Sequence, residues 1–130
     1  MRLHNKVSVI TGGGSGIGKE TARLFAKEGA TVIITDINRH SGEVTVSEIE
    51  ENGGNAAFIE VDVTDPEAVE SAIQQIVKKY KRIDILFNNA GISNVGRVDE
   101  VEPNIWDNVM SVNVKGVYLT SKYALRYMME

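Results

Sequence analysis

The sequence predicts an α/β fold in which helices cover both faces of a parallel β-sheet. Short β-branched runs alternate with longer amphipathic stretches, as they do in successive βαβ units. The 130 residues are enough for one compact domain but too few for two of ordinary size. A composition of 42% hydrophobic and 25% charged residues is that of a globular protein. Residues 1–130 are therefore expected to form a single domain.

Three strands and two helices are expected in the first half of the chain. The strands are the short apolar runs at 6–11, 31–35 and 56–61, and the helices are the stretches at 16–28 and 41–51. Glycines follow both helices, at the position where many helices end. A strand thus alternates with a helix twice, which predicts a parallel arrangement of the strands.

A third helix and a fourth strand follow. Thr64-Asp-Pro-Glu67 combines capping residues with an early proline and predicts a helix that runs to about Tyr80. The nearly unbroken apolar run at 84–88 is typical of a strand that is covered on both faces.

A polar loop at 91–101 leads to a long helix that begins at Pro103. Because this last segment is apolar on almost every side, we expect it to be buried all round. No stop signal follows it, and nothing in the sequence covers the outer edge of the fourth strand. These features predict that the chain is truncated or is completed by another chain.

Composition excludes several classes of function. Fourteen basic against eighteen acidic residues give a net charge of −4, which argues against a nucleic-acid partner. The absence of cysteine excludes disulfides, thiolate metal sites and a cysteine nucleophile, and the two histidines are isolated, so no metal site is expected. No apolar run reaches the ~20 residues that span a bilayer. A cytoplasmic protein without a membrane partner is the expectation.

A glycine cluster between the first strand and the first helix predicts nucleotide binding. Five of the twelve glycines lie within Gly12–Gly18. At such a turn, free backbone N–H groups and the helix dipole favour an anion such as a pyrophosphate. Gly12 allows a sharp turn, Gly16 lets the backbone approach the phosphates, and Gly18 lets the helix pack against the strand. A merely flexible turn is the alternative, but glycine is entropically costly in ordered structure.

The frame T-G-x-x-x-G-x-G of this loop resembles that of the short-chain dehydrogenase/reductase family. Asp62-Val63, Asn88-Asn-Ala-Gly91 and Asn113-Val-Lys-Gly116 match further motifs of the family, in the family's order and along the whole chain. The resemblance implies a doubly wound Rossmann sheet with strand order 3-2-1-4 and a nicotinamide cofactor. Within the loop, the residues expected to bind this cofactor are Gly12, Gly14, Ser15, Gly16, Ile17 and Gly18.

The residues after the second strand indicate which cofactor is bound. Asp36 can accept hydrogen bonds from the adenosine ribose hydroxyls and would repel a 2′-phosphate, although a simple strand-end Asp is the alternative. Ser15 stands where NADP-preferring members of the family often have a basic residue, and Ile37 follows the Asp. These residues favour NAD(H), while the nearby Arg39 leaves NADP(H) open.

The resemblance also assigns residues after the third and fourth strands. Asp62 and Val63 would border the adenine, with helix initiation as the alternative role for Asp62. Small residues in Asn88-Asn-Ala-Gly91 would let the cofactor lie close to the end of the strand. We favour Asn88, Ala90 and Gly91 for contact with the cofactor, because a structural role for Asn89 is at least as plausible.

One catalytic residue of the family has a counterpart here. Asn113 resembles the helix asparagine that holds a water in a proton relay, with a surface or helix-kink asparagine as the alternative. The family's Ser and Tyr-x-x-x-Lys pair lie farther along than this sequence extends. Tyr118 and Lys122 have the right spacing but follow Asn113 by only five residues on the same helix, so Tyr118 is expected to be a packing residue. Ser93 is likewise not the expected serine.

Two hypotheses for function follow. In the first, the protein is an NAD(P)-dependent oxidoreductase that transfers hydride between nicotinamide and a small-molecule alcohol or carbonyl substrate. The resemblance then implies a homo-oligomer in which the last helix forms part of the subunit interface. In the second, the chain is a truncated, non-catalytic dinucleotide-binding module, because the family's Tyr and Lys are not among its residues.

Overall fold

The computed structural model describes residues 1–94 and 96–129. Val95, within the predicted polar loop, and Glu130 lie outside the described residues. In chain order the elements are β1 (Val7–Thr11), α1 (Gly16–Lys27), β2 (Thr31–Asp36), α2 (Arg39–Glu51), β3 (Asn55–Glu60), α3 (Pro66–Tyr80), β4 (Ile85–Phe87), α4 (Pro103–Met110), the π-helical segment η1 (Ser111–Lys115) and α5 (Gly116–Met128).

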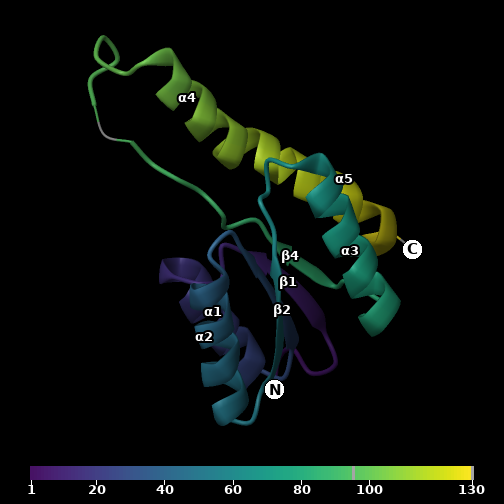
Figure 1. Ribbon diagram of the computed structural model, residues 1–130. Coiled ribbons are helices and arrows are strands. Elements are labelled where there is room, and N and C mark those ends of the chain that lie inside the picture. The colour runs from purple at the N-terminus through teal and green to yellow at the C-terminus, as the bar shows by residue number, and fades with distance from the viewer. Residues whose placement is uncertain (95, 130) are drawn as a thin grey trace.

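The strands form one parallel sheet in the order β3-β2-β1-β4, which confirms the predicted Rossmann topology. Helices α1 and α2 cover one face of this sheet, and α3 and α5 cover the other (Figure 1). Side chains alternate between the faces along each strand. Val9 and Ile33 therefore join the core beneath α3 and α5, whereas Ile10 and Ile34 join the core beneath α1 and α2.

Side-chain caps fix where two of the helices begin. The carboxylate of Asp65 accepts hydrogen bonds from the N–H groups of Glu67 and Ala68 at the start of α3. Asn38 caps α2 by accepting a 3.0 Å hydrogen bond from the N–H of Ser41. Because the cap is Asn38, α2 begins two residues earlier than the sequence pattern predicted.

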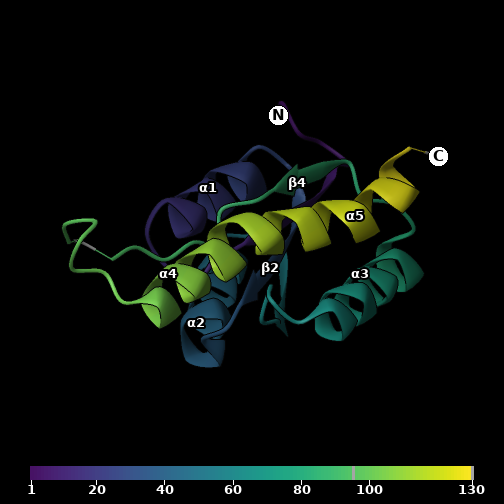
Figure 2. The same cartoon turned by 90° about the horizontal axis from the view of Figure 1, so that it is seen from above.

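The last three helical elements run without interruption from Pro103 to Met128 (Figure 2). The prediction that this helix is buried all round is wrong, because Trp106, Val114 and Tyr118 are between 54% and 60% exposed. Only one side of α5 faces the sheet and α3, and α4 extends past the sheet (Figure 1). The helix therefore presents both a packed side and an open apolar side.

Candidate functional site

A cleft of about 240 Å³ lies at the carboxyl edge of the sheet, where ligands bind in open α/β folds. We call it the strand-end cleft. Its walls come from the loops after all four strands and from η1. The lining residues are Gly12, Ser15, Thr35, Asp36, Ile37, Val61, Asp62, Val63, Asn89, Ala90, Gly91, Ile92 and Val112.

The glycine loop adopts a backbone that other residues would disturb. Gly12 turns the chain with φ of +69°, and its N–H donates to the carbonyl of Thr35 at 2.8 Å. Gly16 also has positive φ, at +55°, and a Cβ placed there would meet no atom within 4 Å from the described residues beyond its chain neighbours and its own helix. A Cβ on Gly18 would instead collide with the carbonyl oxygen of Gly12 and the side chain of Asn89. The loop is thus closely packed at Gly18 and open at Gly16.

The amino end of α1 retains the features of an anion site. Its N-cap residue, Ser15, is extended and makes no side-chain cap hydrogen bond among the described residues. The first turn contains no acidic residue. The first N–H groups of a helix have no partner within the helix, and the dipole places partial positive charge there. Because Ser15 lines the strand-end cleft, the residues present fit a bound pyrophosphate.

Asp36 connects the glycine loop to the end of β2. Its Oδ2 accepts a 2.9 Å hydrogen bond from the N–H of Gly14, and its Oδ1 accepts one of 2.9 Å from the N–H of Asn38. A carboxylate has about four lone-pair sites, so each oxygen keeps one for a further donor. Asp36 can therefore hold the loop and accept hydrogen bonds from ribose hydroxyls at the same time.

Arg39 is the cation near Asp36 because of which the sequence alone does not exclude NADP(H). Its guanidinium lies 3.2 Å from Glu43 and 3.7 Å from Glu60, and its Cζ is 5.7 Å from the centre of the Phe58 ring. Two carboxylates and an aromatic face thus already contact this side chain.

The loop after β4 is tied to the loop after β1. The hydroxyl oxygen of Thr11 accepts hydrogen bonds from the N–H groups of Asn89 and Ala90, at 3.0 and 2.9 Å. The side chain of Asn89 also donates to the carbonyl of Gly12 at 3.1 Å. Asn88 instead donates to the hydroxyl of Ser121 on α5, at 3.1 Å, and does not line the cleft. Of the two asparagines, Asn89 is the one beside the strand-end cleft.

The loop after β3 forms another wall of the cleft. Oδ1 of Asp62 accepts hydrogen bonds from the backbone N–H and the hydroxyl of Thr64, and Asp65, three residues later, is the N-cap of α3. Val63 is buried beneath the cleft against Gly116, where a Cβ would lie 2.7 Å from Cγ2 of Val63. The close approach of the long helix at Gly116 therefore fixes this wall.

Asn113 lies in η1 and finds its partner in the loop after β4. Its Nδ2 donates to the carbonyl of Ile92 at 2.7 Å, and its Oδ1 accepts from the N–H of Ile92 at 2.8 Å. Within η1, the N–H of Gly116 bonds to the carbonyl of Ser111, one residue farther back than in an α-helix. Asn113 thus anchors Ile92, a residue that lines the cleft, to the helix.

The remaining polar candidates lie apart from the cleft or are exposed. Tyr118 is 57% exposed, and Nζ of Lys122 lies 5.9 Å from the centre of its ring, above the face and away from the strand-end cleft. Ser93 is exposed in the loop after Ile92. Residues 1–94 and 96–129 contain no group of acidic or histidine side chains that could hold a metal ion. None of the helices in this part of the chain is long and apolar enough to cross a membrane.

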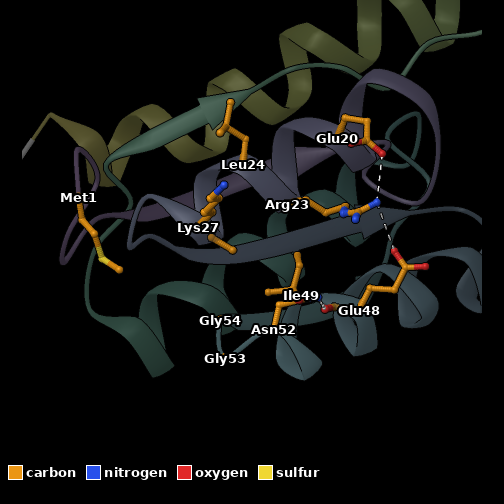
Figure 3. Close-up of a pocket in the computed structure, with 11 residues that line it drawn as sticks. Met1, Glu20, Arg23, Leu24, Lys27, Glu48, Ile49, Asn52, Gly53 and Gly54 are labelled. Atoms are coloured by element: carbon orange, nitrogen blue, oxygen red, sulfur yellow. Dashed lines mark hydrogen bonds and ion pairs between the residues drawn. The ribbon is translucent and has the colours of Figure 1, made fainter.

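A larger hollow, of about 620 Å³, lies between α1 and α2 and is lined mainly by their side chains (Figure 3). Arg23 forms ion pairs within it, with Glu20 at 3.3 Å and with Glu48 at 3.9 Å. None of its lining residues belongs to the glycine loop or follows the carboxyl end of a strand, where ligands bind in open α/β folds.

Sequence reasoning identified most of the strand-end cleft but not all of it. Eight predicted cofactor residues line it, whereas Gly14, Gly16, Ile17, Gly18 and Asn88 do not. Five lining residues were not predicted: Thr35, Val61, Asn89, Ile92 and Val112. The rule that ligands lie beyond the carboxyl ends of strands points to Thr35, Val61 and Asn89. Only the folded position of η1 reveals Val112.

The parallel 3-2-1-4 sheet and the glycine turn at its carboxyl edge define a Rossmann-type fold. Residues 6–130 match the family model of the short chain dehydrogenases, and the chain belongs to this family.

Individual relatives support the same assignment. The chain is 45% identical over 130 residues to an uncharacterized oxidoreductase, YxbG, of Bacillus subtilis, covering 99% of this chain and 48% of that protein. It is 42% identical over 130 residues to a 3-oxoacyl-[acyl-carrier-protein] reductase, FabG, of Thermotoga maritima, covering 100% and 53%. A mutant of a Serratia marcescens short-chain dehydrogenase/reductase has a similar structure, with a TM-score of 0.93, 33% identity and coverage of 98% and 53%. The chain spans about half the length of the curated relatives it matches.

Proposed function

We propose that the protein is an oxidoreductase that transfers hydride between NAD(H) and an alcohol or carbonyl group of a small molecule. The observation that carries this proposal is the strand-end cleft, where the glycine loop, the uncapped end of α1 and Asp36 meet. Relatives bear names as different as secoisolariciresinol dehydrogenase and cyclopentanol dehydrogenase. The proposal therefore names a class of substrate and no single compound.

Different residues of the strand-end cleft would bind different parts of the cofactor. The open amides around Gly16 and the end of α1 would hold the pyrophosphate, and Asp36 would accept the hydroxyls of the adenosine ribose. The adenine would lie by Asp62 and Val63, and the nicotinamide, which supplies or accepts the hydride when bound, by Ala90 and Gly91. Ile17 and Ile37, which are 74% and 71% exposed beside the loop and Asp36, would cover the cofactor from outside.

Asn113 would serve the reaction through its tie to Ile92. Both ends of its amide bond to the Ile92 backbone, which fixes the start of the loop that borders the cleft. The side chain retains one N–H and one lone pair. These could hold the water of the proton relay that the family resemblance implies.

The contacts of two side chains support NAD(H) over NADP(H). The carboxylate of Asp36 would repel a 2′-phosphate on the adjacent ribose. Arg39, the cation that could neutralise such a phosphate, is already paired with Glu43 and Glu60.

Proton transfer would require groups beyond these 130 residues. The curated relatives are about twice as long, and the family's Ser and Tyr-x-x-x-Lys pair have no counterpart here. We propose that this sequence supplies the cofactor-binding half of the enzyme. Without the proton-transfer groups, the purified 130-residue chain should bind NADH and show no turnover, as the alternative of a binding module also requires. We also propose that the protein forms homo-oligomers and is located in the cytoplasm.

Substitution of Asp36 tests the assignment of the cofactor. Asp36→Ala should raise the Kd for NADH by roughly tenfold, because a charged hydrogen-bond acceptor is lost. It should also reduce the preference for NADH over NADPH, because the repulsion of the 2′-phosphate is removed. Both Kd values are measured by fluorescence titration, and thermal unfolding checks that the variant is folded.

The ratio of the Kd for NADPH to the Kd for NADH shows whether Asp36→Ala acts by removing recognition of the ribose or by disordering the glycine loop. Loss of the Gly14 tether alone would weaken both cofactors equally and leave the ratio unchanged. Asp107→Ala, which removes an exposed carboxylate on α4 outside the cleft, is the matched control and should change neither Kd. Unchanged affinities in Asp36→Ala would remove Asp36 from the site.

A further inference from the structure

Thr35 carries a buried hydroxyl that the cofactor proposal does not use. The residue is only 4% exposed, and its Oγ1 has no hydrogen-bond partner among the described residues. In the register of the sheet Thr35 pairs with Thr11 on β1. Both side chains point to the face covered by α3 and α5, because Val9 and Ile33, two positions earlier on each strand, pack there. A buried hydroxyl without a hydrogen-bond partner destabilises a folded protein, so we expect the hydroxyl of Thr35 to have one.

A small internal cavity adjoins this hydroxyl. Its volume is about 10 Å³, and it lies between the sheet, α3 and α5. That is about the minimum space that one water molecule requires. Most of its lining is apolar, but three threonines from three different elements contribute to it: Thr11 of β1, Thr35 of β2 and Thr120 of α5.

The three hydroxyls have complementary hydrogen-bonding capacity left. Oγ1 of Thr11 accepts two backbone N–H groups, which leaves its own O–H free to donate. The hydroxyl of Thr120 donates to the carbonyl of Gly116 at 3.0 Å, so its oxygen can still accept. Thr35 can do either. A water needs two to four polar partners, and this cavity offers three.

We infer that this cavity binds one water molecule, which bridges Thr11, Thr35 and Thr120. The water accepts a hydrogen bond from the O–H of Thr11 and donates one to Oγ1 of Thr120. It forms a third hydrogen bond with the hydroxyl of Thr35, as donor or as acceptor. It joins β1, β2 and α5 beneath the strand-end cleft. Because Oγ1 of Thr11 holds the N–H groups of Asn89 and Ala90, the water supports the floor of the cleft from below. The inference is independent of which cofactor, if any, the cleft binds.

The sign of a stability change tests this inference. Thr35→Val keeps the shape of the side chain but removes the hydroxyl. If the water is present, the variant loses one of its partners, and we expect the melting temperature to fall by about 4 °C. If the cavity is dry, the same substitution removes an unpaired buried hydroxyl and should raise the melting temperature. A rise would overturn the inference.

A matched variant and a direct measurement complete the test. Thr45→Val removes a hydroxyl that is equally buried but bonds within its own helix, to the carbonyl of Ser41, and should change the melting temperature by less than Thr35→Val. In the unmodified protein, NMR should show a nuclear Overhauser effect between a long-lived water and the amide proton of Thr35. Absence of that signal contradicts the inference whatever the variants do.

Discussion

Asp84 shows how one side chain can join two distant parts of the chain. Its Oδ2 accepts a 2.8 Å hydrogen bond from the N–H of Val7, at the start of β1. Its Oδ1 accepts hydrogen bonds from Nη2 and Nε of Arg82, at 2.6 and 3.0 Å. Partial burial acts to raise the pKa of Asp84, but the hydrogen bonds from Arg82 and Val7 outweigh it and hold the pKa below its usual value.

The lowered pKa of Asp84 predicts a loss of stability in acid. A carboxyl group whose pKa is lower in the folded state stabilises the fold above its unfolded pKa, about 3.9, and loses this contribution as the pH falls through the folded pKa. Asp84→Asn should cost about 1–3 kcal/mol at pH 7. It should also flatten the fall in unfolding free energy between pH 5 and pH 2. Urea unfolding at each pH measures both effects.

Asp99 offers a control for this prediction. It also pairs with an arginine, Arg97, at 3.1 Å, but its side chain is 64% exposed. Exposed pairs contribute little, so Asp99→Asn should change the unfolding free energy by less than about 0.5 kcal/mol. Equal acid sensitivity in Asp84→Asn and the unmodified protein would mean that Asp84 is not the group that titrates.

At the scale of the elements, the residue that follows α3 has a backbone conformation that its residue type does not favour. The C-cap residue Lys81 has φ of +72°, in the left-handed region, and its N–H bonds to the carbonyl of Val77. Glycine is the usual residue in such a conformation because it has no Cβ.

Lys81→Gly should therefore raise the free energy of unfolding, by about 0.5–1 kcal/mol, measured by urea unfolding followed by circular dichroism. The same change at Lys79, inside the last turn of α3, should lower it by about 1 kcal/mol. Replacement by glycine should thus raise the free energy of unfolding at Lys81 and lower it at Lys79. Destabilisation by both would contradict the assignment of strain to the backbone at Lys81.

The order and type of the elements could be predicted because local patterns determine them. Alternating strand and helix signals, and the capping residues before α3, are all short-range features. The exposure of the long helix could not be predicted, because an apolar sequence does not say how many of its sides have a neighbour. Trp106 is apolar, yet the described part of the fold leaves it 60% exposed.

Prediction of the site was incomplete for the same reason. The glycine loop and Asp36 could be identified because their spacing along the chain carries the signal. Asn88 and Asn89 are adjacent and chemically identical, and only their orientation in the fold directs one toward Ser121 and the other toward Gly12. The pairing of Asn113 with Ile92 spans 21 residues of sequence and depends on the position of η1.

At the scale of the whole molecule, the long helix leaves an apolar surface uncovered. We define the α4–α5 surface by the exposed apolar side chains of Trp106, Met110, Val114, Tyr118 and Leu125. Contiguous exposed apolar area commonly marks an interaction site, which supports the proposed homo-oligomer.

Trp106→Glu should therefore shift the protein toward a smaller species in sedimentation velocity, because it places a charge in the proposed interface. Leu24→Glu is the matched control. Leu24 is a similarly exposed apolar residue, 55% against 60% for Trp106, but lies on α1, away from the α4–α5 surface. An identical sedimentation coefficient for all three proteins would argue against an interface there.

The contacts of Arg39 bear on how a descendant of this protein could come to use the phosphorylated dinucleotide. Replacement of Asp36 would remove the repulsion and would leave the guanidinium in its ion pairs with Glu43 and Glu60. These side chains are about half exposed, and exposed pairs hold a cation only weakly. One replacement, at Asp36, should therefore be enough to begin such a change of cofactor, and replacement of either glutamate would extend it by freeing the cation.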